Sequence, residues 1–172
     1  MDITQLILDD HAEQRRLFSI LEQIDAGDTE ALTAVWGRLS AFLDAHAEAE
    51  ERFFYPELLK VGEAANDAEG DDAGPETVDA IEDHNKLRDA VRAVGEHRVG
   101  SKAWVEAVGE ANVVNSKHMG EEERQGLTDF RRNAPLETRH ALGVRFAAFV
   151  ATHITGVRPV NKEPEAYVDA HG

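Results

Sequence analysis

The chain has 172 residues, a length that suits one domain with a sizeable buried core. Its 34 acidic and 18 basic residues give a formal net charge of -16, which disfavours nucleic acids and anionic membrane surfaces as partners because both attract basic patches. It has no cysteine, which excludes disulfides, iron–sulfur ligation and cysteine-based zinc sites.

A first helix is predicted over residues 2–26, with Asp2 as its N-cap and Gly27 as its stop. Apolar side chains recur at steps of three and four residues, and His11 lies on the same stripe. The other members of the stripe are Ile3, Ile7, Gln14, Phe18 and Leu21.

A second helix should open at Asp28-Thr29 and kink or end near Pro56, which lacks a backbone donor. His46 and Glu50 continue its apolar face, so an imidazole and a charge interrupt an otherwise apolar stripe. The stretch Gly62–Pro75 has no periodic apolar residues and indicates a mobile acidic loop.

A third helix is predicted to begin at Pro75-Glu76 and to end by Gly100. Ser101 is a plausible N-cap for a fourth, which should end near Gly126. Both helices have polar side chains on their apolar stripes, namely His84, His118 and Glu122.

A shorter fifth helix should start at Pro135, and no strand pattern occurs. We therefore expect an all-α fold, an up-down four-helix bundle with an additional C-terminal helix over residues 1–155. Residues 156–172 contain glycine, prolines and charges, which predicts a tail that is packed on the surface or disordered.

The most informative feature is an internal repeat. His46-Ala-Glu-Ala-Glu50-Glu51 and His118-Met-Gly-Glu-Glu122-Glu123 both read H-x-x-x-E-E. Another histidine precedes each motif at nearly the same distance, His11 in the first copy and His84 in the second. Both of these lead histidines follow two acidic residues.

Residues four apart share one face of a helix, so each repeat can aim a His/Glu pair and a lead histidine into the core. Two carboxylates buried alone would be costly, and a pair of cations would neutralise them. Imidazole and carboxylate together suit iron, manganese or zinc. The candidate ligands are His11, His46, Glu50, His84, His118 and Glu122.

Each part of this candidate metal site also has a simpler interpretation. A single inward histidine is more often hydrogen-bonded within a core, and one H-x-x-x-E motif is common by chance. Two matching motifs with matching lead histidines favour a metal site. A structural bundle that holds zinc adventitiously is the remaining alternative.

The chain also resembles the hemerythrin-like family, the His-His-Glu cation-binding domains. The resemblance covers residues 1 to about 130 and lies in three segments, His46–Pro56, Glu82–Arg88 and His118–Glu123. It implies a four-helix bundle around two iron ions bridged by the two glutamates and by an oxo or hydroxo ligand, with the four histidines as terminal ligands.

One departure matters for function. Oxygen-carrying hemerythrins have a further histidine one turn after the third-helix one, where this chain has Arg88. Water, a substrate or another side chain would fill that position. Tyr55 is a candidate metal ligand, against the alternative of a packed ring whose hydroxyl hydrogen-bonds nearby, and His153 is a weaker candidate.

The remaining polar residues near the motifs are expected to lie at the surface. Glu51 and Glu123 are expected to be solvated charges. Asp10 and Asp83 could serve as supporting partners of the ligand histidines, but they are expected to face solvent because adjacent helix positions point apart. Three further histidines are expected to be exposed, namely His97, His140 and His171.

An open metal position in an apolar core suits small molecules, so the resemblance implies a di-iron protein that reacts with hydrogen peroxide, oxygen or nitric oxide in stress defence, with possible catalase-like activity. The alternative is an oxygen- or iron-binding, sensing or iron-donating protein without turnover. The chain shows no signal peptide or apolar run of about 20 residues, so we expect a cytoplasmic protein, preferentially a monomer.

Overall fold

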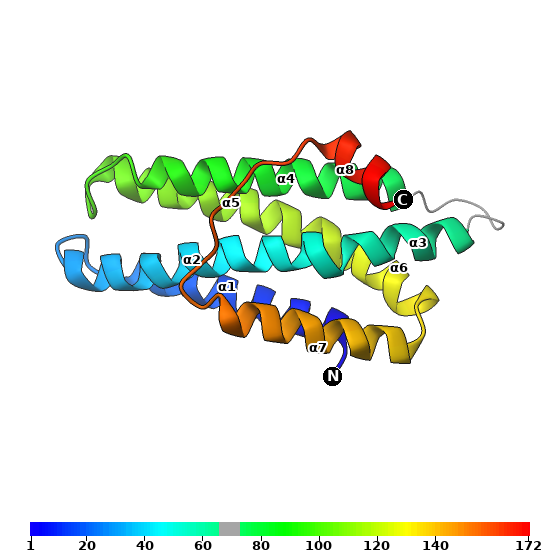
Figure 1. Ribbon diagram of the computed structural model, residues 1–172. Helices are drawn as coiled ribbons and strands as arrows, with labels where there is room; N and C mark the ends of the chain where they lie inside the picture. The colour runs from blue at the N-terminus through cyan, green and yellow to red at the C-terminus, as the bar shows by residue number, and fades with distance from the viewer. Residues whose placement is uncertain (66–72) are drawn as a thin grey trace.

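The computed structural model describes residues 1–65 and 73–172, and all regular structure in these ranges is helical. The helices are α1 (Ile3–Gln23), α2 (Thr29–Phe53), α3 (Tyr55–Ala65), α4 (Ala73–Val94), α5 (Lys102–Arg124), α6 (Gly126–Asn133), α7 (Leu136–Thr152) and α8 (Pro164–His171). Figure 1 shows α1, α2, α4 and α5 running in alternating directions in one bundle, while α3 continues the line of α2. The predicted all-α bundle is confirmed, and α7 is the additional helix. The sequence pattern does not indicate α6 and α8.

Three of the bundle helices begin where the sequence predicts. The side chains of Asp2, Asp28 and Ser101 each accept a hydrogen bond from a backbone amide two or three residues later, so all three are N-caps. The helix end expected near Pro56 is also present, because α2 ends at Phe53 and α3 begins two residues on. The predicted stop at Gly27 is late, since α1 already ends at Gln23.

The stretch Gly62–Pro75, expected as a loop, is partly helical. α3 extends to Ala65 and α4 begins at Ala73, while residues 66–72 lie outside the described ranges. Alanine is the strongest helix former, and a proline in the first turn of a helix costs no hydrogen bond, which explains both extensions.

The core consists of two apolar clusters with a polar layer between them. On α1, α2 and α4, a histidine stands between an apolar residue of one cluster and an apolar residue of the other. The cluster near α3 and α6 includes Ile3, Ile7, Phe54, Ile81, Phe130 and Phe146, and the other includes Leu17, Phe18, Leu39, Leu43, Leu87 and Trp104. The apolar clusters therefore hold the four helices in register on both sides of the histidines.

The segment after α7 packs on the bundle. It passes over α2, where Gly156 has a φ of 94° and a Cβ atom at that position would lie 3.3 Å from the Cα of Ala41. The chain then crosses to α4, against which α8 lies (Figure 1). Tyr167 of α8 is only 7% exposed. Of the two states expected for residues 156–172, the surface-packed one is observed.

No helix within the described ranges combines the length and the apolar character that crossing a bilayer requires.

The apolar cluster remote from α3 should supply stability independently of the polar layer. Leu39 is fully buried there, so Leu39→Ala should lower the free energy of unfolding by about 2–5 kcal/mol through lost burial and a residual cavity. Urea unfolding monitored by circular dichroism measures the loss. Val113→Ala is the control, because Val113 is 70% exposed and its truncation should change stability by less than about 0.5 kcal/mol. Equal losses of unfolding free energy in the two variants would contradict the assignment of Leu39 to a buried apolar cluster.

Candidate metal centre

The polar layer contains six titratable side chains that converge from the four bundle helices. Each is at most 6% exposed, although imidazoles and carboxylates normally seek water. α1 contributes one histidine, α4 contributes one, and α2 and α5 each contribute a histidine and a glutamate one turn apart. The six are His11, His46, Glu50, His84, His118 and Glu122. The structure thus brings together the whole ligand set expected from the repeat.

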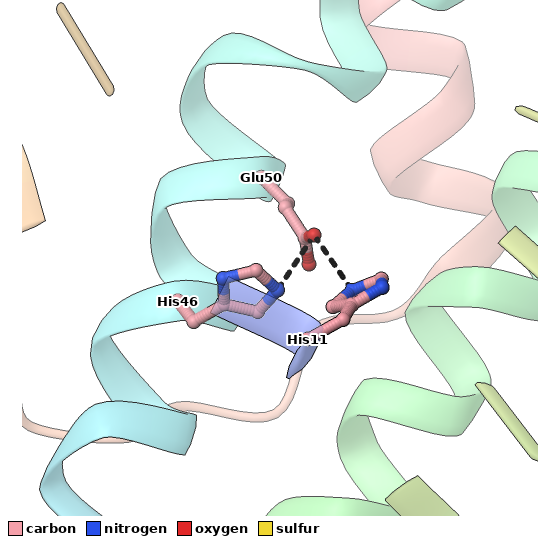
Figure 2. Close-up of side chains that lie close together, drawn as sticks. All are labelled: His11, His46 and Glu50. Atoms are coloured by element: carbon pink, nitrogen blue, oxygen red, sulfur yellow. Dashed lines mark ion pairs between the residues drawn. The ribbon is translucent and has the colours of Figure 1, made fainter. Parts of the chain in front are cut away.

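Glu50 stands at the centre of the group, and its two carboxylate oxygens face different histidine pairs. Oε1 lies 2.8 Å from Nε2 of His46 and 3.8 Å from Nε2 of His11 (Figure 2). Oε2 lies 3.2 Å from Nε2 of His84 and 4.0 Å from Nε2 of His118. Two groups of potential ligands in the described residues therefore share Glu50, and within each group the ligand atoms lie within 4.8 Å of one another.

Glu122 faces the same space from α5. Its Oε2 lies 3.4 Å from Nε2 of His11, and its Oε1 accepts a hydrogen bond of 2.7 Å from the hydroxyl of Tyr55. Tyr55 is 1% exposed, and its ring lies 5.8 Å from that of His84, centroid to centroid. The tyrosine considered as a ligand therefore borders the group on the side of His84.

Carboxylates orient three of the four histidine rings from behind. In each case Nδ1 lies 2.8–3.0 Å from a carboxylate oxygen, so Nδ1 carries the proton and the Nε2 lone pair faces the centre. The pairs are His11 with Glu123, His46 with Asp10, and His84 with Glu51.

The centre leaves several of its polar atoms without hydrogen bonds. Five of the eight buried side-chain nitrogens and oxygens that lack a partner in the described residues belong to this group. They are Nε2 of His11 and of His46, both oxygens of Glu50, and Oε2 of Glu122. Donors that bind one cation at about 2.0–2.2 Å lie roughly 3–4 Å apart, which is the spacing seen here. The donor set and its geometry fit two cations.

Four interpretations of neighbouring acidic residues were wrong. Glu51 is 2% exposed and Glu123 supports His11, so neither is a free solvated charge. Asp10 reaches His46 on the next helix, and Asp83 is buried against Lys86 and Lys117. Adjacent positions do point apart on one helix, but in a bundle the second position points at a neighbouring helix. The recurrence of the second glutamate in both motifs is the signal that could have revealed this.

Two other residues considered in the sequence take no place in the centre. Arg88 is 3% exposed and donates two hydrogen bonds to Glu51, so its guanidinium supports the carboxylate behind His84. His153 caps α7, where its ring stacks on Phe149 and its Nδ1 lies 2.8 Å from the carbonyl oxygen of that residue.

The pKa values show how the centre balances its charge with protons. Burial lowers the pKa of His11, but hydrogen bonds to Glu122 and Glu123 outweigh it and raise the value to about 11. Burial likewise lowers the pKa of His46, but Glu50 and Asp10 raise it to about 9. Burial, followed by repulsion from Glu50, raises the pKa of Glu122. Positive charge is therefore needed among these carboxylates, and cations would replace the protons on the histidines.

The chain was compared with known proteins. A family model described as the hemerythrin HHE cation binding domain matches residues 2–129, a range that includes all six side chains and ends before α7 and α8. No curated protein and no solved structure matches the chain.

Stability of the chelator-treated protein should fall as the pH rises above neutral. The pKa values of His11 and His46 in the folded protein, about 11 and 9, exceed the value of 6.5 for the unfolded chain. Their protons therefore stabilise the fold fully below pH 6.5, and this contribution disappears as the pH rises through 9 and 11. The melting temperature measured from about pH 6 to pH 10 tests this, with metal-loaded protein as the control. A constant melting temperature in the chelator-treated sample would contradict the prediction.

Proposed function

The chain belongs to the hemerythrin HHE cation-binding family, and on that premise we propose that it is a non-heme di-iron protein that reacts with small oxidants, above all hydrogen peroxide. The observation that carries the proposal is the sharing of Glu50 between two histidine pairs, each facing one of its oxygens. One carboxylate placed in this way suits a bridge between two metal ions.

In the proposed centre, His11 and His46 would hold one iron and His84 and His118 the other, while Glu50 and Glu122 would contribute a carboxylate to both. Tyr55 is proposed as a further ligand on the side of His84. Its oxygen lies 2.7 Å from Oε1 of Glu122, a spacing that two oxygen ligands of one cation adopt. The guanidinium of Arg88 has hydrogen-bond donors and no acceptor, so it supplies no ligand.

A cavity of about 330 Å³ gives small molecules a path to this side of the centre. Its lining includes the buried Glu122 and Tyr55 together with His118, and it extends to the exposed side chains of Glu82 and Lys86. Six carboxylates and three basic side chains line it, so it favours neutral molecules and cations over organic anions. Peroxide, oxygen and nitric oxide are small and uncharged and satisfy this selection.

The chemistry follows from the metal and from the way the chain encloses it. Iron that cycles between the ferrous and ferric states would let two molecules of peroxide disproportionate into one of oxygen and two of water. The protein supplies neutral histidines held by Asp10, Glu51 and Glu123, and two apolar clusters that exclude bulk water. It thereby confines the reaction to molecules that pass the cavity.

Removal of one histidine should abolish metal binding and turnover together. His118→Ala deletes a nitrogen donor 4.0 Å from Oε2 of Glu50, so we expect fewer than two irons per chain and loss of oxygen evolution from added peroxide. Metal analysis and an oxygen electrode measure the two properties on protein purified without added metal.

His97→Ala is the matched control, because His97 is exposed and lies outside the polar layer. It should retain metal and activity. Circular dichroism establishes that the His118→Ala variant is folded. Retention of both irons by a folded His118→Ala variant would contradict the ligand assignment. Reversible spectral change with oxygen and no turnover in the unaltered protein would indicate a carrier.

The role of Tyr55 can be tested by colour. A phenolate bound to ferric iron absorbs intensely in the visible range, so the iron-loaded protein should show such a band and Tyr55→Phe should remove it while two irons stay bound. Absorption spectroscopy with parallel metal analysis measures this. A band that persists in Tyr55→Phe, or is absent from the unaltered protein, would restrict Tyr55 to donating its hydrogen bond to Glu122.

A further inference from the structure

Glu51 links the metal centre to the C-terminal segment, residues 156–172. One of its oxygens lies 2.8 Å from Nδ1 of His84, and Arg88 donates hydrogen bonds to both oxygens. Lys162 binds the second oxygen and also lies 3.1 Å from Glu48. The hydroxyl of Tyr167 donates to the backbone carbonyl of the same glutamate. Two residues of the segment thus hold the residue that orients a proposed ligand.

The segment is fixed at this point by its backbone as well. The side-chain amide of Asn85 donates to the carbonyl oxygen of Lys162 at 2.6 Å and accepts from its backbone N–H at 2.9 Å. Asn85 directly follows His84 on α4. The ammonium group of Lys162 is therefore brought to Glu51 by a reciprocal pair of hydrogen bonds beside the proposed ligand. Its side chain is 26% exposed, so it is partly withdrawn from water.

The other two supporting carboxylates are more exposed to water. The side chains of Asp10 and Glu123 are 23% and 27% exposed, so water can solvate them in other orientations. The side chain of Glu51 is 0% exposed, and its orientation is set by Arg88 and Lys162 alone among charged partners in the described ranges, apart from His84 itself. The half of the centre with His84 thus depends on a contact from outside the matched family region, residues 2–129.

We propose that Lys162 and Tyr167 are positioning residues for the metal centre, which hold Glu51 so that it fixes the ring of His84 and thereby tightens metal binding in the His84–His118 half. This rests on the proposed function. The physical reason is that a carboxylate bound to the outer nitrogen of a ligand histidine sets its tautomer and orientation and raises its basicity. Arg88 divides one nitrogen, Nη2, between the two oxygens of Glu51, so the ammonium group of Lys162 gives the second oxygen a donor of its own.

Lys162→Met tests the proposal in the full-length protein. It retains most of the side-chain length and removes the charge from Glu51. Titration of metal-free protein with Co²⁺ should show two equivalents, one with unchanged affinity and one weakened about tenfold with an altered visible spectrum. Tyr167→Phe should weaken the same equivalent to a smaller extent. Lys162→Arg should restore both affinity and spectrum, because it returns a cation to Glu51.

Lys102→Met is the matched control, because the side chain of Lys102 is 89% exposed and lies on α5 outside the polar layer. It should leave both equivalents unchanged. Melting temperatures for all variants establish that they are folded. Two unchanged equivalents and an unchanged spectrum in Lys162→Met would overturn this inference while leaving the di-iron proposal intact. Failure of the unaltered protein to bind any metal would overturn both.

Discussion

The buried carboxylates of Glu50 and Glu122 impose the constraint on which the rest of the polar layer depends. Neither can remain ionised in an apolar core without compensating positive charge, because removing a carboxylate from water costs several kcal/mol. Protonated histidines meet this need in part, as the raised pKa values of His11 and His46 indicate. Cations would meet it more completely, since they would bind both glutamates and the lone pairs of the histidines. Two apolar clusters flank the layer on either side.

The two sequence repeats support each other across the bundle. The second glutamate of the first motif, Glu51, orients His84, the lead histidine of the second repeat. The second glutamate of the second motif, Glu123, orients His11, the lead histidine of the first. In each repeat, the first of the two adjacent glutamates therefore belongs to the centre, and the second contacts a histidine of another helix. The symmetry then breaks, because Asp10 supports His46 whereas its counterpart Asp83 pairs with lysines.

Sequence reasoning predicted the bundle and the convergence of six side chains, because both follow from helical periodicity and from positions four apart on one helix. It failed where contacts cross between helices. The exposure of Glu51 depends on how α2 packs against α4, and no single-helix pattern encodes that geometry. The contacts of Lys162 and Tyr167 are more remote, since more than 100 positions separate them from Glu51 in sequence. Residues in such a segment show no periodicity that would reveal what they touch.

Arg88 distinguishes the side of the centre with His84 from the side with His11 and His46. One turn after His84 this chain has a guanidinium, which has no acceptor atom to bind a metal and which donates hydrogen bonds to Glu51 instead. In the proposed centre, the half with His84 and His118 would therefore have two histidine nitrogens, as the half with His11 and His46 would. The cavity also borders this half, at His118, Glu122 and Tyr55. Small molecules that enter the cavity would therefore meet the proposed centre on the side that Arg88 supports through Glu51 and His84. The guanidinium would thus act on the reacting side without binding the metal.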